Sequence, residues 1–334
     1  MIKKLLVGFS ALIVLYILGP KVEYEPVTLF ETSLGKTGAE LENYITEKEK
    51  RINDLKENNA SKIYWYHDSL KQKTTYVVLY LHGFSASPEE GKDFVLEFGK
   101  KYGCNVYIPR LEDHGRNDTM SFVNLTPDNY LQSAEDAVDV AQNLGENIIL
   151  ISCSTGSTLG LILAANGEKI HAHFMYSPNI DIADKKSELL LYPWAKQLSR
   201  IVKKGDFNRV DYTEEQKKYW NHIYHMNGAF VVKNLINDYM KKEWFQKINH
   251  PVFVAYYYKN EAMQDDVVSV QRIKKMFEEL GTVSDLKKEI AFSDVMTHMI
   301  ISPLFSKQYE EIKSKSYEYA ETVLSLKPMQ DIKM

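Results

Sequence analysis

The stretch that most constrains this chain begins as a buried strand at residues 148–151 and continues through a small polar turn into a helix. Residues 148–151 are Ile-Ile-Leu-Ile, which is typical of a strand buried on both faces. Residues 157–165 (Ser-Thr-Leu-Gly-Leu-Ile-Leu-Ala-Ala) indicate a buried helix. A strand that turns directly into a helix needs small residues two positions before and after the corner. Ser154 meets this requirement, because Ser152 and Gly156 flank it.

The neighbouring positions fit the corner less well. Cys153 would have Ile151 two residues before it, and Ser152 would have Leu150 there. A serine at such a corner is exposed as a candidate nucleophile, so Ser154 is the predicted nucleophile. Ser152 stands where the G-x-S-x-G pattern has its first glycine. Taken alone, the stretch is equally compatible with a buried strand that ends in a polar turn.

Composition narrows the class of protein. The 334 residues are 44% hydrophobic and 26% charged, as in an ordinary globular protein with a large core. The formal net charge of -4 and the lack of a long basic run give no reason to expect nucleic-acid binding. Cys104 and Cys153 are too few for a disulfide framework or a metal site, and we interpret both as small core residues.

Residues 1–20 have the pattern of a signal-anchor or a signal peptide. Lys3 and Lys4 precede an apolar run over residues 5–18. Residues 17–19 (Ile-Leu-Gly) do not provide the small residues of a good cleavage site, which favours an uncleaved anchor. The lysines would stay on the cytoplasmic side, so we expect the remaining chain to face outside the cytoplasm. Cleavage would instead make it a periplasmic or secreted protein.

Strands and helices alternate along most of the remaining chain. Residues 21–60 are polar with apolar residues at helical spacing, which predicts a helix against the domain or a stalk. Strands are predicted at residues 61–67, 74–81, 104–109, 148–151, 171–178, 251–258 and 287–292, with helices between them and a closing helix at 306–326. This alternation predicts an α/β fold with a mostly parallel, doubly wound sheet, formed by residues 61–183 and 250–334.

Residues 184–249 interrupt the alternation. They contain no convincing strand and several helical segments with tryptophans, tyrosines and lysines. An insertion at this point, before the penultimate strand, predicts a helical cap over the carboxyl ends of the strands, where ligands bind in such sheets.

A serine nucleophile needs a base and a carboxylate that orients the base, in the chain order serine, acid, histidine. His298 follows the last predicted strand and precedes the closing helix, so it is the predicted base. The other histidines lie on a strand, in or beside the cap, or too early in the chain: His171, His173, His222, His225, His250 and His67.

The acid is expected in the loop after the strand at 251–258. Glu261, Asp265 and Asp266 all lie there, and Asp265 is favoured because it stands two residues before an apolar pair that would begin a helix. Either aspartate could instead only cap that helix. Asp181, after an earlier strand, remains a minor candidate.

Acyl transfer also needs hydrogen-bond donors for the oxyanion, and backbone N–H groups at strand ends suit this role. Thr155, directly after the predicted nucleophile, and Phe84, after the strand at 74–81, are the predicted donors. Gly83 would let the backbone approach closely. We interpret His82 as a structural hydrogen-bonding partner of this loop rather than a base.

Five ordered motifs over residues 61–326 together resemble the α/β-hydrolase superfamily, and most closely its carboxylesterase and monoacylglycerol-lipase-like group. They are His82-Gly83-Phe84, the loop from Pro109 to Gly115, the turn at Ser154, Asp265 with Val267-Val268, and His298. The resemblance implies an eight-stranded, mostly parallel sheet with a cap, and serine-hydrolase chemistry without a cofactor. Two positions depart from the family pattern: Ser152 replaces the first glycine of the turn, and Asp113 stands where the second loop usually has glycine.

The sequence therefore predicts a membrane-anchored or exported serine hydrolase that cleaves a carboxylic ester, acyl or aryl and possibly monoacylglycerol-like, through an acyl-enzyme. Ser154 would attack, His298 would carry the proton, and Asp265 would orient His298. Two other interpretations stay open: a peptidase or amidase on the same scaffold, and a binding module on this fold that lacks activity.

Overall fold

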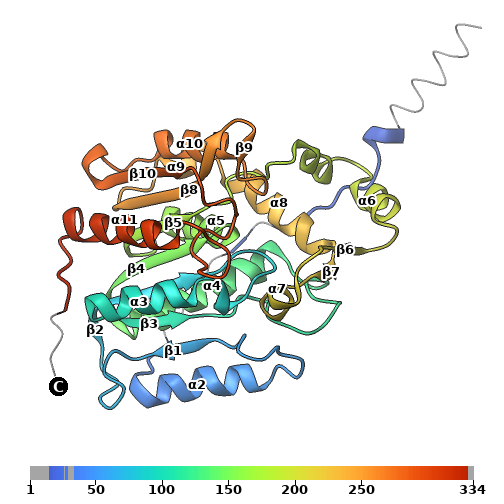
Figure 1. Ribbon diagram of the computed structural model, residues 1–334. Helices are drawn as coiled ribbons and strands as arrows, with labels where there is room; N and C mark the ends of the chain where they lie inside the picture. The colour runs from blue at the N-terminus through green and yellow to red at the C-terminus, as the bar shows by residue number, and fades with distance from the viewer. Residues whose placement is uncertain (1–14, 26, 29–33, 330–334) are drawn as a thin grey trace, which may run out of the picture.

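The computed structural model of the protein describes residues 15–25, 27–28 and 34–329, and its centre is a sheet of eight strands (Figure 1). The strand order is β1-β3-β2-β4-β5-β8-β10, and β9 pairs with β8. The pairings β1–β3 and β8–β9 are antiparallel, and the others are parallel. The mostly parallel α/β sheet predicted from the sequence is confirmed. The strands are β1 (Lys62–Tyr64), β2 (Thr74–Leu81), β3 (Asn105–Ile108), β4 (Gly145–Cys153), β5 (Ile170–Tyr176), β8 (Val252–Asn260), β9 (Met263–Gln264) and β10 (Lys287–Phe292).

Helices cover both faces of this sheet, so it is doubly wound. On one face lie α3 (Lys92–Tyr102) and α11 (Tyr309–Thr322), and their apolar side chains form one core with the sheet. The other core includes α2 (Gly38–Lys50), α4 (Pro127–Gln142), α5 (Thr155–Ala165) and α10 (Val270–Glu279). Two 3-10 turns, η1 (Pro88–Glu90) and η3 (Ser284–Leu286), complete the connections.

The apolar run of β4 explains why this strand lies in the middle of the sheet. Ile148 and Leu150 belong to the core that contains α4 and α5. Ile149 and Ile151 belong to the core that contains α3 and α11. Successive side chains of a strand point to opposite faces, so a continuous apolar run is stable only where both faces are covered.

We use the name cap for the segment between β5 and β8, where the sequence predicts the insertion. Its elements are η2 (Lys185–Leu191), α6 (Ala195–Lys203), β6 (Phe207–Arg209), α7 (Glu214–Tyr219), β7 (Ile223–His225), α8 (Asn227–Tyr239) and α9 (Lys242–Phe245). The sequence predicted no strand in residues 184–249, and this was wrong, because β6 and β7 form a two-stranded antiparallel ribbon. Each strand has only three residues, which is too short for a period-2 alternation to be recognised.

The described residues before β1 contact the molecule in two places. The N–H group of Trp194 in the cap donates a 2.8 Å hydrogen bond to the carbonyl of Pro20. Farther along, α2 packs on the other side of the molecule beside β1, with Leu41 and Ile45 buried (Figure 1). Within the described part of the chain, no helix has both the length and the apolar character needed to cross a bilayer. Most of the predicted anchor, residues 1–14, lies outside the described residues.

Candidate active site

Ser154 stands at the corner between β4 and α5, in a backbone conformation that few residues adopt. Its φ and ψ angles are 51° and −121°. A positive φ in a residue other than glycine is strained and persists only where surrounding contacts hold it. Here the N–H of Ser154 donates to the carbonyl of Tyr176, and its carbonyl accepts from the N–H groups of Ser157 and Asn179, each at 3.0 Å.

Gly156 is needed because α5 begins very close to the end of β2. A Cβ atom at this position would lie 2.1 Å from the carbonyl oxygen of Leu81 and 2.7 Å from that of His82. Both distances are far inside van der Waals contact. Close packing of the two backbones therefore explains why the sequence pattern requires a small residue two positions after the serine.

Ser152, which departs from the glycine of the family pattern, has a fully buried side chain with its own partners. Its hydroxyl lies 2.7 Å from Nε2 of His173 and 2.8 Å from Oγ of Ser157. Gly160 leaves room for this arrangement, because a Cβ there would lie 2.8 Å from the His173 ring. The turn accommodates serine because a buried histidine on β5 satisfies the extra hydroxyl.

Asp265 and His298, which are far apart in the sequence, are hydrogen-bonded to each other. The Nδ1–H group of His298 donates to Oδ2 of Asp265 at 2.7 Å. The other carboxylate oxygen, Oδ1, accepts from the N–H groups of Val267 and Val268 at 3.0 and 3.1 Å. Since Nδ1 carries the proton in this bond, Nε2 of a neutral His298 is free to accept one.

The other candidate acids lie elsewhere. Asp266 is exposed, and Glu261 is also exposed, where its carboxylate accepts from the Tyr258 hydroxyl. Asp181 forms a 2.8 Å ion pair with Lys233. Among these candidates, Asp265 is the one that the structure brings to His298.

Charges around His298 favour its protonated form. Burial alone would lower the pKa of the imidazole, but the Asp265 carboxylate and, more weakly, Glu90 outweigh it, so the pKa of His298 is raised. Burial would likewise raise the pKa of Asp265. His298 and the two backbone N–H donors outweigh that effect and hold the pKa of Asp265 below its usual value. Asp265 is therefore ionised at neutral pH, as a carboxylate that orients a base must be.

The predicted oxyanion loop passes directly beside Ser154. A Cβ on Gly83 would lie 3.2 Å from Cβ of Ser154. The ring of the next residue, Phe84, lies in an aromatic cluster, with ring centroids 4.7 Å from Phe122 and 5.4 Å from Tyr224 of the cap. Thr155 is the first residue of α5, where backbone N–H groups have no partner within the helix.

His82 joins this loop to the loop after β3. Its Nδ1 lies 2.9 Å from the carbonyl of Gly83, and its Nε2 accepts a 3.1 Å hydrogen bond from the N–H of Leu111. Full burial lowers the pKa of His82 to about 4, so the ring is neutral at neutral pH. With both ring nitrogens occupied, His82 acts as a structural connection between loops.

Glu90 was not identified from the sequence, although it lies at the same site. Its buried Oε2 accepts 2.8 Å hydrogen bonds from the N–H of Gly83 and from the hydroxyl of Tyr80. Burial raises the pKa of this carboxyl group. Glu90 thus holds the His82–Gly83 peptide, which is one peptide unit before the N–H of Phe84. A glutamate at the start of a helical pattern normally indicates an exposed first turn, so the sequence carried no signal for this role.

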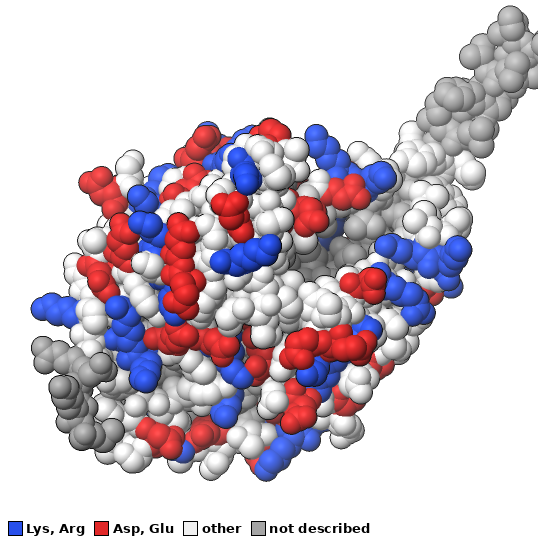
Figure 2. Space-filling view, viewed as in Figure 1, with Lys and Arg blue, Asp and Glu red and all other residues white. Residues whose placement is uncertain are grey.

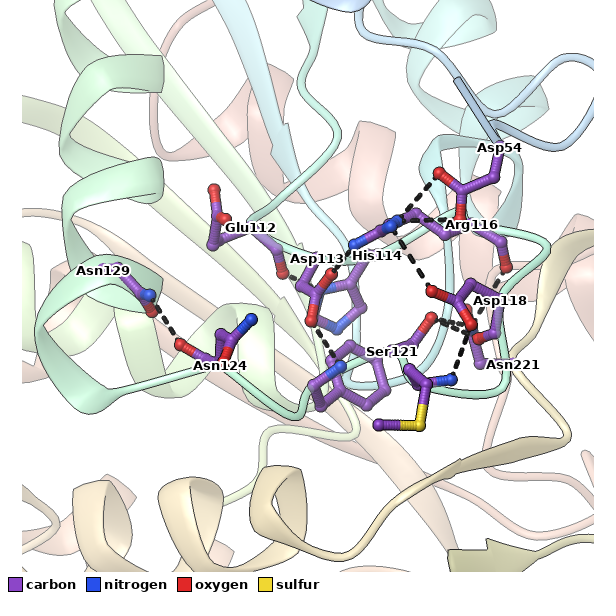
Figure 3. A network of polar contacts seen from close by, with 12 residues as sticks. Asp54, Glu112, Asp113, His114, Arg116, Asp118, Ser121, Asn124, Asn129 and Asn221 are labelled. Atoms are coloured by element: carbon purple, nitrogen blue, oxygen red, sulfur yellow. Dashed lines mark hydrogen bonds and ion pairs between the residues drawn. The ribbon is translucent and has the colours of Figure 1, made fainter. Parts of the chain in front are cut away.

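Asp113, the second departure from the family pattern, organises the loop after β3 (Figure 3). Its φ is 61°, a conformation that aspartate tolerates better than most residues. One carboxylate oxygen bonds Nη1 of Arg116 at 2.5 Å, and the other accepts from the N–H of Phe122. Arg116 in turn reaches Asp54 at 3.0 Å, and its carbonyl accepts a 3.2 Å hydrogen bond from Asn221 of the cap. The aspartate therefore provides contacts that glycine cannot.

Among the described residues, no group of three or more His, Cys, Asp and Glu side chains is arranged to hold a metal ion. Cys104 and Cys153 are buried and free.

Comparisons with solved structures find close similarity of fold at low sequence identity. A metagenome-derived lipolytic enzyme of the LipS and LipT pair aligns with a TM-score of 0.64 and 14% identity, over 79% of this chain and 98% of the other. Monoacylglycerol lipase from Paleococcus ferrophilus aligns at 0.56 and 14%, over 78% and 96%. Est1E from Butyrivibrio proteoclasticus, with ferulic acid bound, aligns at 0.53 and 14%, over 79% and 95%.

No family model matches the sequence, and no curated protein matches it either. The sheet order, the turn at Ser154 and these alignments together show that the chain has the α/β-hydrolase fold.

Proposed function

We propose that this protein is a serine hydrolase that cleaves a carboxylic ester of an acyl or aryl group, such as a monoacylglycerol. The observation that carries the proposal is the 2.7 Å hydrogen bond between Asp265 and His298, on the loops that follow β9 and β10. It is combined with Ser154 at a strained corner between β4 and α5. Two of the structural neighbours are a lipolytic enzyme and a monoacylglycerol lipase, which agrees with ester hydrolysis.

In the proposed mechanism, Oγ of Ser154 attacks the ester carbonyl while Nε2 of His298 takes its proton. The N–H groups of Phe84 and Thr155 stabilise the oxyanion of the tetrahedral intermediate. Protonated His298 then gives the proton to the departing alcohol, which leaves an acyl group on Ser154. Water, activated by His298, releases the acid and restores the serine.

Labelling with a fluorophosphonate probe tests the nucleophile. We expect the wild-type protein and the control Ser199→Ala, which changes a cap serine, to be labelled, and Ser154→Ala to remain unlabelled. A folded wild-type protein that stays unlabelled would support a binding module and contradict the proposal.

Turnover of p-nitrophenyl esters of graded chain length, beside matched amides, tests the substrate class. We expect ester turnover that depends on Ser154 and His298. Faster turnover of the amides would instead indicate a peptidase or amidase.

We also propose that the apolar run after Lys3 and Lys4 anchors the chain in a membrane, with the folded part outside the cytoplasm. Protease treatment of intact cells and of lysed cells tests this topology. Cleavage of the folded part in intact cells supports it. Protection in intact cells, with cleavage only after lysis, contradicts it.

A further inference from the structure

The cap has an unusual concentration of exposed apolar side chains beside the first described residues. The structure describes seventeen exposed large apolar side chains, and nine of them belong to η2, α6, the turn between them and the N-terminal segment. We call this surface the cap face. It consists of Leu189, Tyr192, Leu198, Ile201 and Val202 together with Leu15, Tyr16, Ile17 and Leu18.

Helix α6 is amphipathic, and its apolar side is open at the C-terminal end. Leu198, Ile201 and Val202 follow the three-and-four spacing that aligns side chains on one side of a helix. Ile201 and Val202 are 74% and 75% exposed, respectively. Ala195, one turn earlier on the same side, is buried. The apolar side is thus covered where α6 begins and uncovered where it ends.

The N-terminal segment covers the beginning of α6. The indole Nε1 of Trp194 donates a 3.3 Å hydrogen bond to the carbonyl of Leu15. Gly19 lies against the same ring, since a Cβ there would be 1.9 Å from the indole nitrogen. Leu15 and Gly19, at the end of the apolar run and just after it, therefore contact the folded domain at the cap face.

Positive charge surrounds this apolar surface. Residues 185–204 contain six Lys and Arg residues and one acidic residue, Glu188, whose carboxylate contacts Lys233. On α6, Lys196, Arg200 and Lys203 lie on the side away from Leu198 and Ile201. Figure 2 shows Lys and Arg side chains over the region of η2 and α6, with some Asp and Glu side chains among them, and Arg200 is paired with Asp206 at 2.9 Å. A helix with an apolar side and a basic side is typical of an element that lies in the interface of an anionic membrane.

From these observations we propose that the cap face binds the surface of a lipid bilayer that contains anionic lipids, with Leu198, Ile201 and Val202 inserted at the level of the headgroups. Through η2 and α6 this is a membrane contact in addition to the N-terminal run, whose last residues lie beside α6. It holds the cap at the bilayer instead of letting the domain move freely on a tether. The inference does not depend on which bond the protein hydrolyses.

A pair of matched single-cysteine labels tests the proposal in the full chain. Cys104 and Cys153 are buried, so a fluorophore sensitive to polarity reacts selectively with an introduced exposed cysteine. Val202→Cys reports on the cap face. Val283→Cys, at an exposed valine beside η3, is the control. The labelled proteins are reconstituted with vesicles of phosphatidylcholine and phosphatidylglycerol that carry nitroxide lipids.

We expect the label at position 202 to shift to shorter wavelength and to be quenched by the nitroxide lipids, at least severalfold more than the label at position 283. Vesicles of phosphatidylcholine alone should give weaker quenching. Equal, low quenching at both positions would overturn the proposal, because only the N-terminal run would then contact lipid.

Blue-shifted fluorescence from the label at position 202 in the absence of vesicles would also overturn the proposal. If this shift is independent of protein concentration, residues 1–14 cover the face. If it grows with concentration, a second copy of the chain does. Ile201→Asp provides a further check, since it should reduce quenching at position 202 while turnover of a soluble ester stays unchanged.

Discussion

The surroundings of His298 have opposing effects on the pKa of its imidazole. Burial disfavours the imidazolium, whereas Asp265 and Glu90 favour it and raise the pKa of the ring. The base must be neutral to accept a proton from Ser154, so activity is lost as pH falls through this raised pKa. We therefore expect the acid limb of the kcat/KM profile to lie above pH ~6.5, the ordinary value for histidine.

Asp265→Asn tests the effect of the Asp265 carboxylate on the pKa of His298. Removing the carboxylate removes the main charge that raises the pKa of His298, so the acid limb should move to lower pH. By analogy with serine protease triads, kcat should fall about 10⁴-fold, because the amide no longer fixes the correct tautomer. The measurement is a pH–rate profile with a soluble ester, and Asp266→Asn is the matched control with nearly wild-type rates. Full activity in Asp265→Asn would contradict the assignment.

Glu90 presents a different case, since it acts on the loop rather than on the reacting atoms. In Glu90→Ala, the N–H of Gly83 and the hydroxyl of Tyr80 lose a buried acceptor, and the His82–Gly83 peptide next to the oxyanion loop loses its support. We expect kcat to fall by up to about 10²-fold with little change in KM, because positioning of an oxyanion donor is lost.

Two variants separate this effect from general destabilisation. Glu90→Gln retains an acceptor for Gly83 and should recover much of kcat. Tyr80→Phe removes only the other partner and should affect stability more than kcat. Unchanged kcat in folded Glu90→Ala would show that the loop does not need this support.

At the scale of elements, the active-site geometry depends on how closely α5 approaches the end of β2. Gly156→Ala would insert a methyl group 2.1 Å from the carbonyl oxygen of Leu81, so α5 must move away from the sheet. We expect a loss of about 1–3 kcal/mol in the free energy of unfolding, together with loss of probe labelling at Ser154. Urea unfolding measures the first effect, and Gln197→Ala, at an exposed position of α6, is the control. Wild-type stability would contradict the packing described here.

For the whole molecule, Arg116 connects three parts of the chain: Asp54 before the sheet, Asp113 after β3, and Asn221 in the cap (Figure 3). Arg116→Gln leaves the mostly buried carboxylate of Asp113 without its cation. Because Arg116 is itself partly exposed, we expect a loss of about 1–3 kcal/mol in the free energy of unfolding.

Limited proteolysis checks the location of this effect. Cleavage should become faster near Asp54 and residues 113–121, where the ion pairs of the side chain are lost, whereas the hydrogen bond from Asn221 to the main-chain carbonyl of residue 116 is retained. Arg209→Gln, at an exposed arginine of the cap ribbon, should leave the cleavage pattern unchanged. An unaltered pattern in Arg116→Gln would show that this loop does not depend on the ion pairs of Arg116.

The sequence by itself determined the architecture, because burial on both faces of a sheet demands continuous apolar runs such as those of β2, β4 and β8. The same local patterns identified the corner at Ser154, where small flanking residues are a steric necessity. They also located His298 at a strand end. They did not reveal the β6–β7 ribbon, whose strands are too short for a period to appear.

Only the tertiary structure decided which polar groups meet. Asp265 and Asp266 are adjacent and chemically identical, and burial against His298 distinguishes them. The hydroxyl of Ser152 is accommodated because His173 on β5 provides a hydrogen-bond partner. The carboxylate of Glu90 accepts a hydrogen bond from the N–H of Gly83 across a turn. These contacts join residues distant in the sequence, and side-chain pairing across such distances leaves no periodic trace in a single chain.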